Sequence, residues 1–162
     1  MASSDLSLPL DFLDAIARET AAPGGGSVSA VTGAMAAGLV EMAARFSHEW
    51  DEAAATIEKA RVLRERFVEL AAADADAFAA FLAAEQAEKA AALARATRIP
   101  KEIAEHAEVV GKLADLVAAR GNQRLLGDAY AARRLALAVQ ETAVKLVKLN
   151  LAEAGNLESE PT

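Results

Sequence analysis

Three aspartates of this chain have a setting in which a carboxylate could do chemistry. Asp128 ends the stretch 120–128 (RGNQRLLGD), which brings a turn, an amide, guanidinium groups and a carboxylate to a helix entrance. A carboxylate there could stabilise a cationic substrate or move a proton, or it could serve only as a helix N-cap. Asp74 and Asp76 interrupt an alanine-rich helical run, so they mark either a functional break or a solvent-facing turn.

A glycine-rich loop precedes the most apolar helix. Residues 22–27 read APGGGS, so few side chains keep a ligand away from the backbone. A serine at the end of the loop could cap the helix, and the free amides at its positive end would suit an anionic group. A flexible joint is the structural alternative. The binding candidates of this loop are Pro23, Gly24, Gly25, Gly26 and Ser27.

Other polar residues are candidates for substrate binding. Asn122 and Arg124 lie in the stretch 120–128, where the guanidinium groups could hold ligand carboxylates or could simply be solvated. Glu41 is the one ionisable residue in the run 24–44, and a carboxylate there belongs either to a site or, as we expect, to the surface. His48 and His106 lack a second ligand at helical spacing, so we expect two surface histidines and no metal site.

The elements that must position these residues are all expected to be helices. Hydrophobic residues make up 54% of the 162 residues and aromatic residues only 4%, a composition that favours closely packed helices over sheets. No stretch alternates as a strand would. The patterns and breaks predict helices over 8–17, 27–46, 51–84 (with a possible joint near residue 73), 85–97, 99–120 and 125–152, followed by a fraying acidic tail. A left-handed cap is expected at Gly121.

Charge and composition limit the possible partners. The net charge of −7 argues against nucleic acid and anionic membranes, and the absence of cysteine excludes disulfides and thiolate metal sites. Residues 1–8 lack the features of a signal peptide, and the apolar run 24–40 is judged too short and too interrupted to span a membrane, so we expect a cytoplasmic protein. Gly26, Ala30, Ala34 and Gly38 form a ridge of small residues, and the last helix is apolar on two sides; together they predict a homodimer.

The chain resembles the cyclodeaminase/cyclohydrolase family, which includes the C-terminal domain of formiminotransferase-cyclodeaminase and bacterial methenyltetrahydrofolate cyclohydrolases. The most specific match is FLDAIA at 12–17 followed by APGGGS at 22–27 and by the helix that ends in LVEM at 39–42. Weaker matches are ADADAF at 73–78, IPKEIAE at 99–105, GN at 121–122 with GD at 127–128, and KLNL at 148–151. The resemblance covers residues 8–152 of a single domain, 1–162, and leaves the acidic tail 153–162 unmatched.

The resemblance implies an all-α, up-and-down helical bundle that forms a homodimer and binds a tetrahydrofolate derivative near the glycine loop and the subunit interface. It implies a formimino-tetrahydrofolate cyclodeaminase or a methenyl-tetrahydrofolate cyclohydrolase that needs neither metal nor cofactor. Asp128 is then the first catalytic candidate, followed by Asp74 and Asp76.

The chain also departs from the family pattern. A Gly-Lys pair usually follows the second helix, whereas residues 46–51 read FSHEWD; Gly127 stands where a serine usually precedes the aspartate; and the segment between Leu82 and Ile99 is shorter than usual. A lysine in the first of these places could bind the glutamate carboxylates of folate. Two alternatives therefore remain open: a related enzyme with a non-folate substrate, for a cyclisation or a C–N elimination, and a binding or scaffold protein without catalysis.

Overall fold

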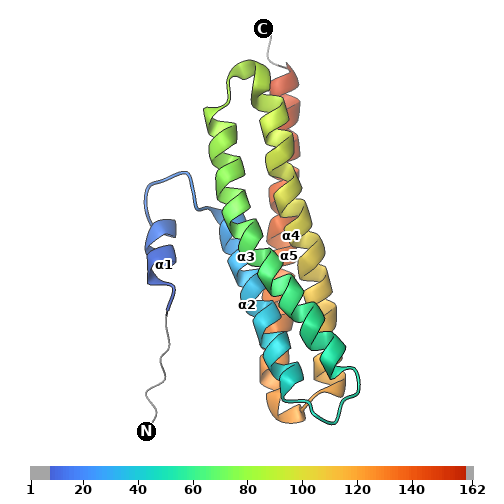
Figure 1. Ribbon diagram of the computed structural model, residues 1–162. Coiled ribbons are helices and arrows are strands. Elements are labelled where there is room, and N and C mark those ends of the chain that lie inside the picture. The colour runs from blue at the N-terminus through green and yellow to red at the C-terminus, as the bar shows by residue number, and fades with distance from the viewer. Residues whose placement is uncertain (1–7, 160–162) are drawn as a thin grey trace.

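The computed structural model describes residues 8–159, and expectations about residues 1–7 and 160–162 lie outside the described part (Figure 1). Every regular element within 8–159 is a helix, which confirms the predicted fold class. The elements are α1 (Leu10–Ile16), α2 (Gly25–Arg45), α3 (Ala53–Ala83), α4 (Gln86–Arg120), the 3-10 helix η1 (Gln123–Leu125) and α5 (Leu126–Ser159).

The helices α2 to α5 run alternately up and down and form one bundle, whereas α1 stands beside it (Figure 1). The helix α2 has 21 residues, but α3, α4 and α5 have 31, 35 and 34. At 1.5 Å per residue, α2 spans only about 30 Å of a bundle about 50 Å long. Four helices therefore surround the core at the end where α2 finishes, and only three continue beyond the residue where α2 begins.

Small residues bring α2 and α3 close together. The ridge of small residues turns toward α3, because a Cβ atom on Gly26 would meet Asp74 and one on Gly38 would lie 3.6 Å from Arg64. Gly33 lies against a ring of α3, because an added Cβ would lie 2.6 Å from the Phe67 ring. Phe67 is completely buried, so its ring fills the space that the glycine leaves.

Two expected helix breaks are absent. Residues 85–120 were expected to form two helices that meet at Ile99-Pro100, but α4 runs through Pro100 without interruption. Pro100 is buried, and the packing of α4 in the bundle outweighs the one hydrogen bond that proline cannot donate. The possible joint near residue 73 is also absent, because α3 is a single helix.

The ends of the last two helices also differ from expectation. Gly121 ends α4 with φ −82° and ψ −170°, so the backbone is extended and the expected left-handed cap is wrong. The tail expected to fray from residue 155 continues α5 to Ser159.

Several apolar residues expected to be buried are exposed. The helix α1 buries none of its residues. Leu149 and Leu151 of the last helix, which was expected to be central in the bundle or buried in a dimer, are 51% and 60% exposed in the single chain.

The helix α2 is long and apolar enough to cross a membrane by length and composition, so the opposite judgement from the sequence is wrong. In the apolar window of this helix 61% of the residues are buried inside the bundle, and a core helix needs the same composition.

We expect Phe67→Ala to lower the free energy of unfolding by about 3–5 kcal/mol, because it removes the largest fully buried side chain and leaves a cavity beside Gly33. Urea denaturation followed by circular dichroism measures this loss. Val68→Ala is the matched control: Val68 is 59% exposed, and its loss should stay within about 0.5 kcal/mol. Equal losses in the two variants would contradict this account of the core.

Candidate functional site

A cavity of about 270 Å³ opens where α2 begins. Each of the three longer helices contributes two lining residues one turn apart, and the glycine loop forms the remaining wall. The helix residues are Asp74 and Phe78 from α3, Ala96 and Pro100 from α4, and Leu146 and Asn150 from α5. The loop residues are Ala21, Ala22, Gly24, Gly25 and Gly26. The cavity thus occupies the position that a fourth long helix would fill.

The carboxylate of Asp74 lies against the first turn of α2. The Ser27 hydroxyl donates a 3.0 Å hydrogen bond to Oδ2 of Asp74, and the Ser27 amide also stabilises the charged carboxylate. Ser27 was expected to cap α2 itself, but the N-cap residue is Gly24 and no side chain of the loop caps the helix. The Asp74 carboxylate therefore accepts from a backbone amide at the start of α2 that has no partner within the helix. It also brings negative charge to the positive end of the helix dipole.

Burial raises the pKa of Asp74 above its ordinary value of 3.8, while the hydroxyl and the amide of Ser27 act in the opposite direction. A half-buried carboxylate with a raised pKa can accept and return a proton. Because Asp74 already occupies the helix N-terminus, the wall of the cavity near it suits a cationic group of a ligand better than an anionic one.

The Asp74 carboxylate can lie against the first turn of α2 because residue 26 is a glycine. A Cβ atom at Gly26 would lie 2.0 Å from Oδ1 of Asp74, whereas a Cβ atom at the neighbouring Gly25 would meet nothing within 4 Å. The third glycine of the three, Gly26, is therefore required by the carboxylate, and the second, Gly25, is not.

The cavity also contains a residue that the sequence reasoning did not single out as a site residue. Asn150 of α5 is half-buried and lines the cavity. The spacing of the sequence could have identified it. Asn150 follows Leu146 by four residues and so lies on the same apolar face of the helix, where a polar side chain is unusual and suggests a site.

The remaining catalytic candidates lie outside this cavity. Asp76 follows Asp74 by two residues, so it points to another side of α3 and is exposed. Asp128 lies in the first turn of α5 and lines neither of the two hollows described here, and it is not the N-cap, because the helix begins at Leu126. Pro23 belongs to the loop and precedes the glycines that line the cavity.

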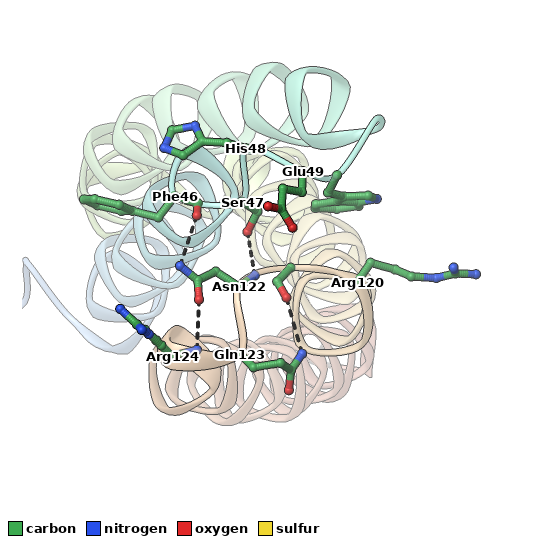
Figure 2. Close-up of a pocket in the computed structure, with 10 residues that line it drawn as sticks. Phe46, Ser47, His48, Glu49, Arg120, Asn122, Gln123 and Arg124 are labelled. Atoms are coloured by element: carbon green, nitrogen blue, oxygen red, sulfur yellow. Dashed lines mark hydrogen bonds between the residues drawn. The ribbon is translucent and has the colours of Figure 1, made fainter.

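Asn122 and Arg124 lie at the opposite end of α2, beside a wide depression of about 700 Å³ (Figure 2). The Asn122 side chain donates to the Phe46 carbonyl at 3.1 Å and accepts from the backbone amide of Arg124 at 3.0 Å. The backbone amide of Asn122 donates to the Ser47 hydroxyl at 2.8 Å. These bonds tie the α4–α5 turn to the end of α2. Figure 2 shows the guanidinium groups of Arg120 and Arg124 pointing away from the centre of the depression on opposite sides.

The two groups of predicted site residues are far apart within one chain. Gly26 and Phe46 lie at opposite ends of α2, and their separation along the helix is about 30 Å. The structure thus joins the glycine loop with Asp74 but leaves Asn122 and Arg124 at a different place.

Glu41 is not the surface residue that was expected. It is only 7% exposed, and its carboxylate accepts from Arg45 at 2.6 Å and from Arg64 at 3.0 Å. Burial alone would raise the pKa of Glu41, but the two arginines outweigh burial and lower it. Glu41 joins α2 to α3 at mid-helix and lines neither hollow.

Within residues 8–159, no group of three histidine, aspartate or glutamate side chains is arranged to hold a metal ion. His48 is exposed, as expected. His106 is instead half-buried, with its ring 5.9 Å from the Phe67 ring and its Nε2 atom 3.2 Å from Glu102.

We expect Gly26→Ala to destabilise the protein by about 1–3 kcal/mol, because the new methyl group displaces the Asp74 carboxylate from the start of α2. Gly25→Ala is the matched control and should be neutral or stabilising, since alanine is the better helix former and has space there. Thermal and urea unfolding of both variants measure the difference. A Gly26→Ala variant as stable as Gly25→Ala would show that the carboxylate is not held at this glycine.

Comparison with known proteins identifies the family. The family described as formiminotransferase-cyclodeaminase matches residues 10–158. A methenyltetrahydrofolate cyclohydrolase from Methylorubrum extorquens is 33% identical and aligns with 86% of this chain and 76% of its own length. The crystal structure of a formiminotetrahydrofolate cyclodeaminase from Thermotoga maritima superposes with a TM-score of 0.84 at 30% identity, covering 92% of this chain and 80% of that one. The resemblance inferred from the motifs is confirmed, and the chain belongs to the formiminotransferase-cyclodeaminase family.

Proposed function

We propose that this protein is an enzyme acting on a one-carbon derivative of tetrahydrofolate, as a methenyl-tetrahydrofolate cyclohydrolase or a formimino-tetrahydrofolate cyclodeaminase. The observation that carries the proposal is the half-buried Asp74 carboxylate, which faces a cavity at the glycine loop. Membership of a family with both activities among its relatives supports it.

The two reactions make the same demand on the site. In the hydrolysis, a water oxygen bonds to the methenyl carbon and loses one proton; the bond from that carbon to one folate nitrogen then breaks as the nitrogen takes up a proton and the hydroxyl loses its second proton to become the formyl C=O, so that one proton is released overall. In the cyclodeamination, a folate N–H nitrogen bonds to the formimino carbon and gives up its proton, the terminal nitrogen takes up that proton and one more, and its bond to the carbon breaks, which releases ammonia and leaves the cationic methenyl bridge. Both pass through a cationic, amidinium-like carbon and need a group that accepts and returns a proton. Asp74 has the charge and the position for that role.

The size of the cavity limits what it can hold. A volume of about 270 Å³ accommodates a ring system but not a whole folate, so the aminobenzoyl-glutamate part must extend outside. Among residues 8–159, no cationic side chain lines the cavity, and residues 46–51 lack a lysine. The arginines near Asn122 are too distant in the same chain to reach that part of the ligand.

A homodimer would resolve this difficulty. If α2 of one protomer lay antiparallel to α2 of its partner, the glycine loop of one would approach the Asn122 region of the other. Exposed apolar residues are present for such a contact: Met35 on α2 and Phe46 directly after it are 53% and 56% exposed, and Leu10 and Leu13 on α1 are 59% and 48% exposed. In this arrangement Arg124 could hold the glutamate carboxylates.

A second candidate, an enzyme for a smaller cationic substrate without carboxylates, is favoured by one observation. The cavity holds Asp74 but no basic side chain, as a substrate without glutamate would require.

We expect the purified protein to change the absorbance of the methenyl group: a rapid loss with methenyl-tetrahydrofolate for a cyclohydrolase, or a gain with ammonia release from formimino-tetrahydrofolate for a cyclodeaminase. Asp74→Asn should lower kcat by about 100-fold or more, because general acid–base catalysis contributes about that much. In the wild type, kcat/KM should rise with pH as Asp74 loses its proton, with a midpoint above 3.8, and this limb should be absent in the variant.

Glu105→Gln, an equivalent change at an exposed position of α4, is the control and should leave the rate unchanged. No catalysis and no binding of reduced folates by the wild type would exclude the folate enzyme and favour the smaller substrate. Normal activity of Asp74→Asn would remove Asp74 from the mechanism.

A further inference from the structure

Among the described residues that line the cavity, Asp74 and Asn150 are the two with polar side chains. The side-chain amide of Asn150 makes no hydrogen bond to any residue in the range 8–159, and the residue is half-buried. No side-chain nitrogen or oxygen atom of the described residues is fully buried without a partner, so the acceptor and the two donors of this amide stay open to solvent in the cavity. The amide is therefore available to a ligand that enters the cavity.

The two polar groups lie on different walls. Asp74 comes from α3 beside the start of α2, and Asn150 comes from α5, one turn beyond Leu146 toward the C-terminal end of that helix. The surfaces between them are apolar and belong to Phe78, Pro100 and Leu146. Such a cavity suits a flat ring that packs on the apolar walls and is oriented by a polar contact at each side.

The depression at the other end of α2 differs, because its side chains without a hydrogen-bond partner in the described part of the chain, those of His48, Glu49, Arg120 and Arg124, are exposed. There the Asn122 and Ser47 side chains are already occupied by backbone partners, and the Gln123 amide donates to the Ala118 carbonyl at 3.1 Å (Figure 2).

We propose that Asn150 is a positioning and specificity residue that recognises the lactam edge, an N–H next to a C=O, of the ligand ring. This inference rests on the proposed function, because the ring of reduced folate carries such an edge at its 4-oxo group and the adjacent N–H. The Asn150 amide accepts from the N–H and donates to the C=O, a pair that only a group with both functions can make. The ring is thereby oriented so that its one-carbon group faces Asp74.

The test compares two ring fragments that differ at this edge. A reduced 2-amino-4-oxopteridine has the lactam, and its 3-methyl derivative lacks the N–H of that edge. We expect wild-type protein to bind the unmethylated ring at least about tenfold more tightly in calorimetry, because a polar site discriminates strongly against a ligand that leaves its groups unpaired, and no rotation of the Asn150 amide restores a partner for its oxygen. Asn150→Leu, which has similar volume but no polar atoms, should lose this preference, and its KM for the full substrate should rise about tenfold with a smaller change in kcat.

The controls separate recognition from folding and from catalysis. Lys148→Leu changes an exposed residue of the same helix and should keep the preference. The acid limb of the pH profile, which belongs to Asp74, should be unchanged in Asn150→Leu. An Asn150→Leu variant with the wild-type preference and KM would overturn the inference, and so would a wild type that turns over folate without distinguishing the two rings; in both cases the proposed function would stand. A wild type that neither converts reduced folates nor binds either ring would contradict both proposals.

Discussion

The contact between the Asp74 carboxylate and the first turn of α2 is the interaction on which the candidate site depends. It fixes where α2 begins relative to α3, because the carboxylate lies directly over Gly26 and bonds to Ser27. Since α2 begins there and the other helices continue, the bundle has three helices instead of four beyond this point. The cavity is therefore a consequence of helix length, and the same contact that starts the helix places a carboxylate in its wall.

The composition of the chain follows from the same geometry. Helices that approach closely need alanine and glycine at their contacts, and α2 supplies them along the side that faces α3. Where a large side chain does enter the core, as Phe67 does, a glycine faces it. Charged groups at this contact are paired, since Glu41 of α2 accepts from Arg64 of α3. The packing that stabilises the bundle thus also fixes the register of α2 against α3, on which the position of the site depends.

The fold was largely predictable from the sequence, and the site was predictable only in part. Apolar periodicity and alanine content determine helices, and a glycine loop before a long apolar helix indicates a place where a ligand can approach the backbone. Contacts between distant positions were not accessible in this way. The start of α2 is stabilised by Asp74 rather than capped by Ser27, and this depends on the register between α2 and α3, which brings together two residues 47 positions apart in sequence. Burial of Glu41 depends in the same way on Arg64, and the continuity of α4 through Pro100 depends on tertiary packing that local rules omit.

The central claim is that the ring of a reduced folate lies in the cavity where α2 begins. A crystal structure of the protein with methenyl-tetrahydrofolate or a stable reduced analogue tests it most directly. The account predicts ring density between Phe78, Pro100 and Leu146, with the one-carbon group toward Asp74. Density for the ring in the depression beside Asn122, with the cavity at the glycine loop holding only water, would contradict it.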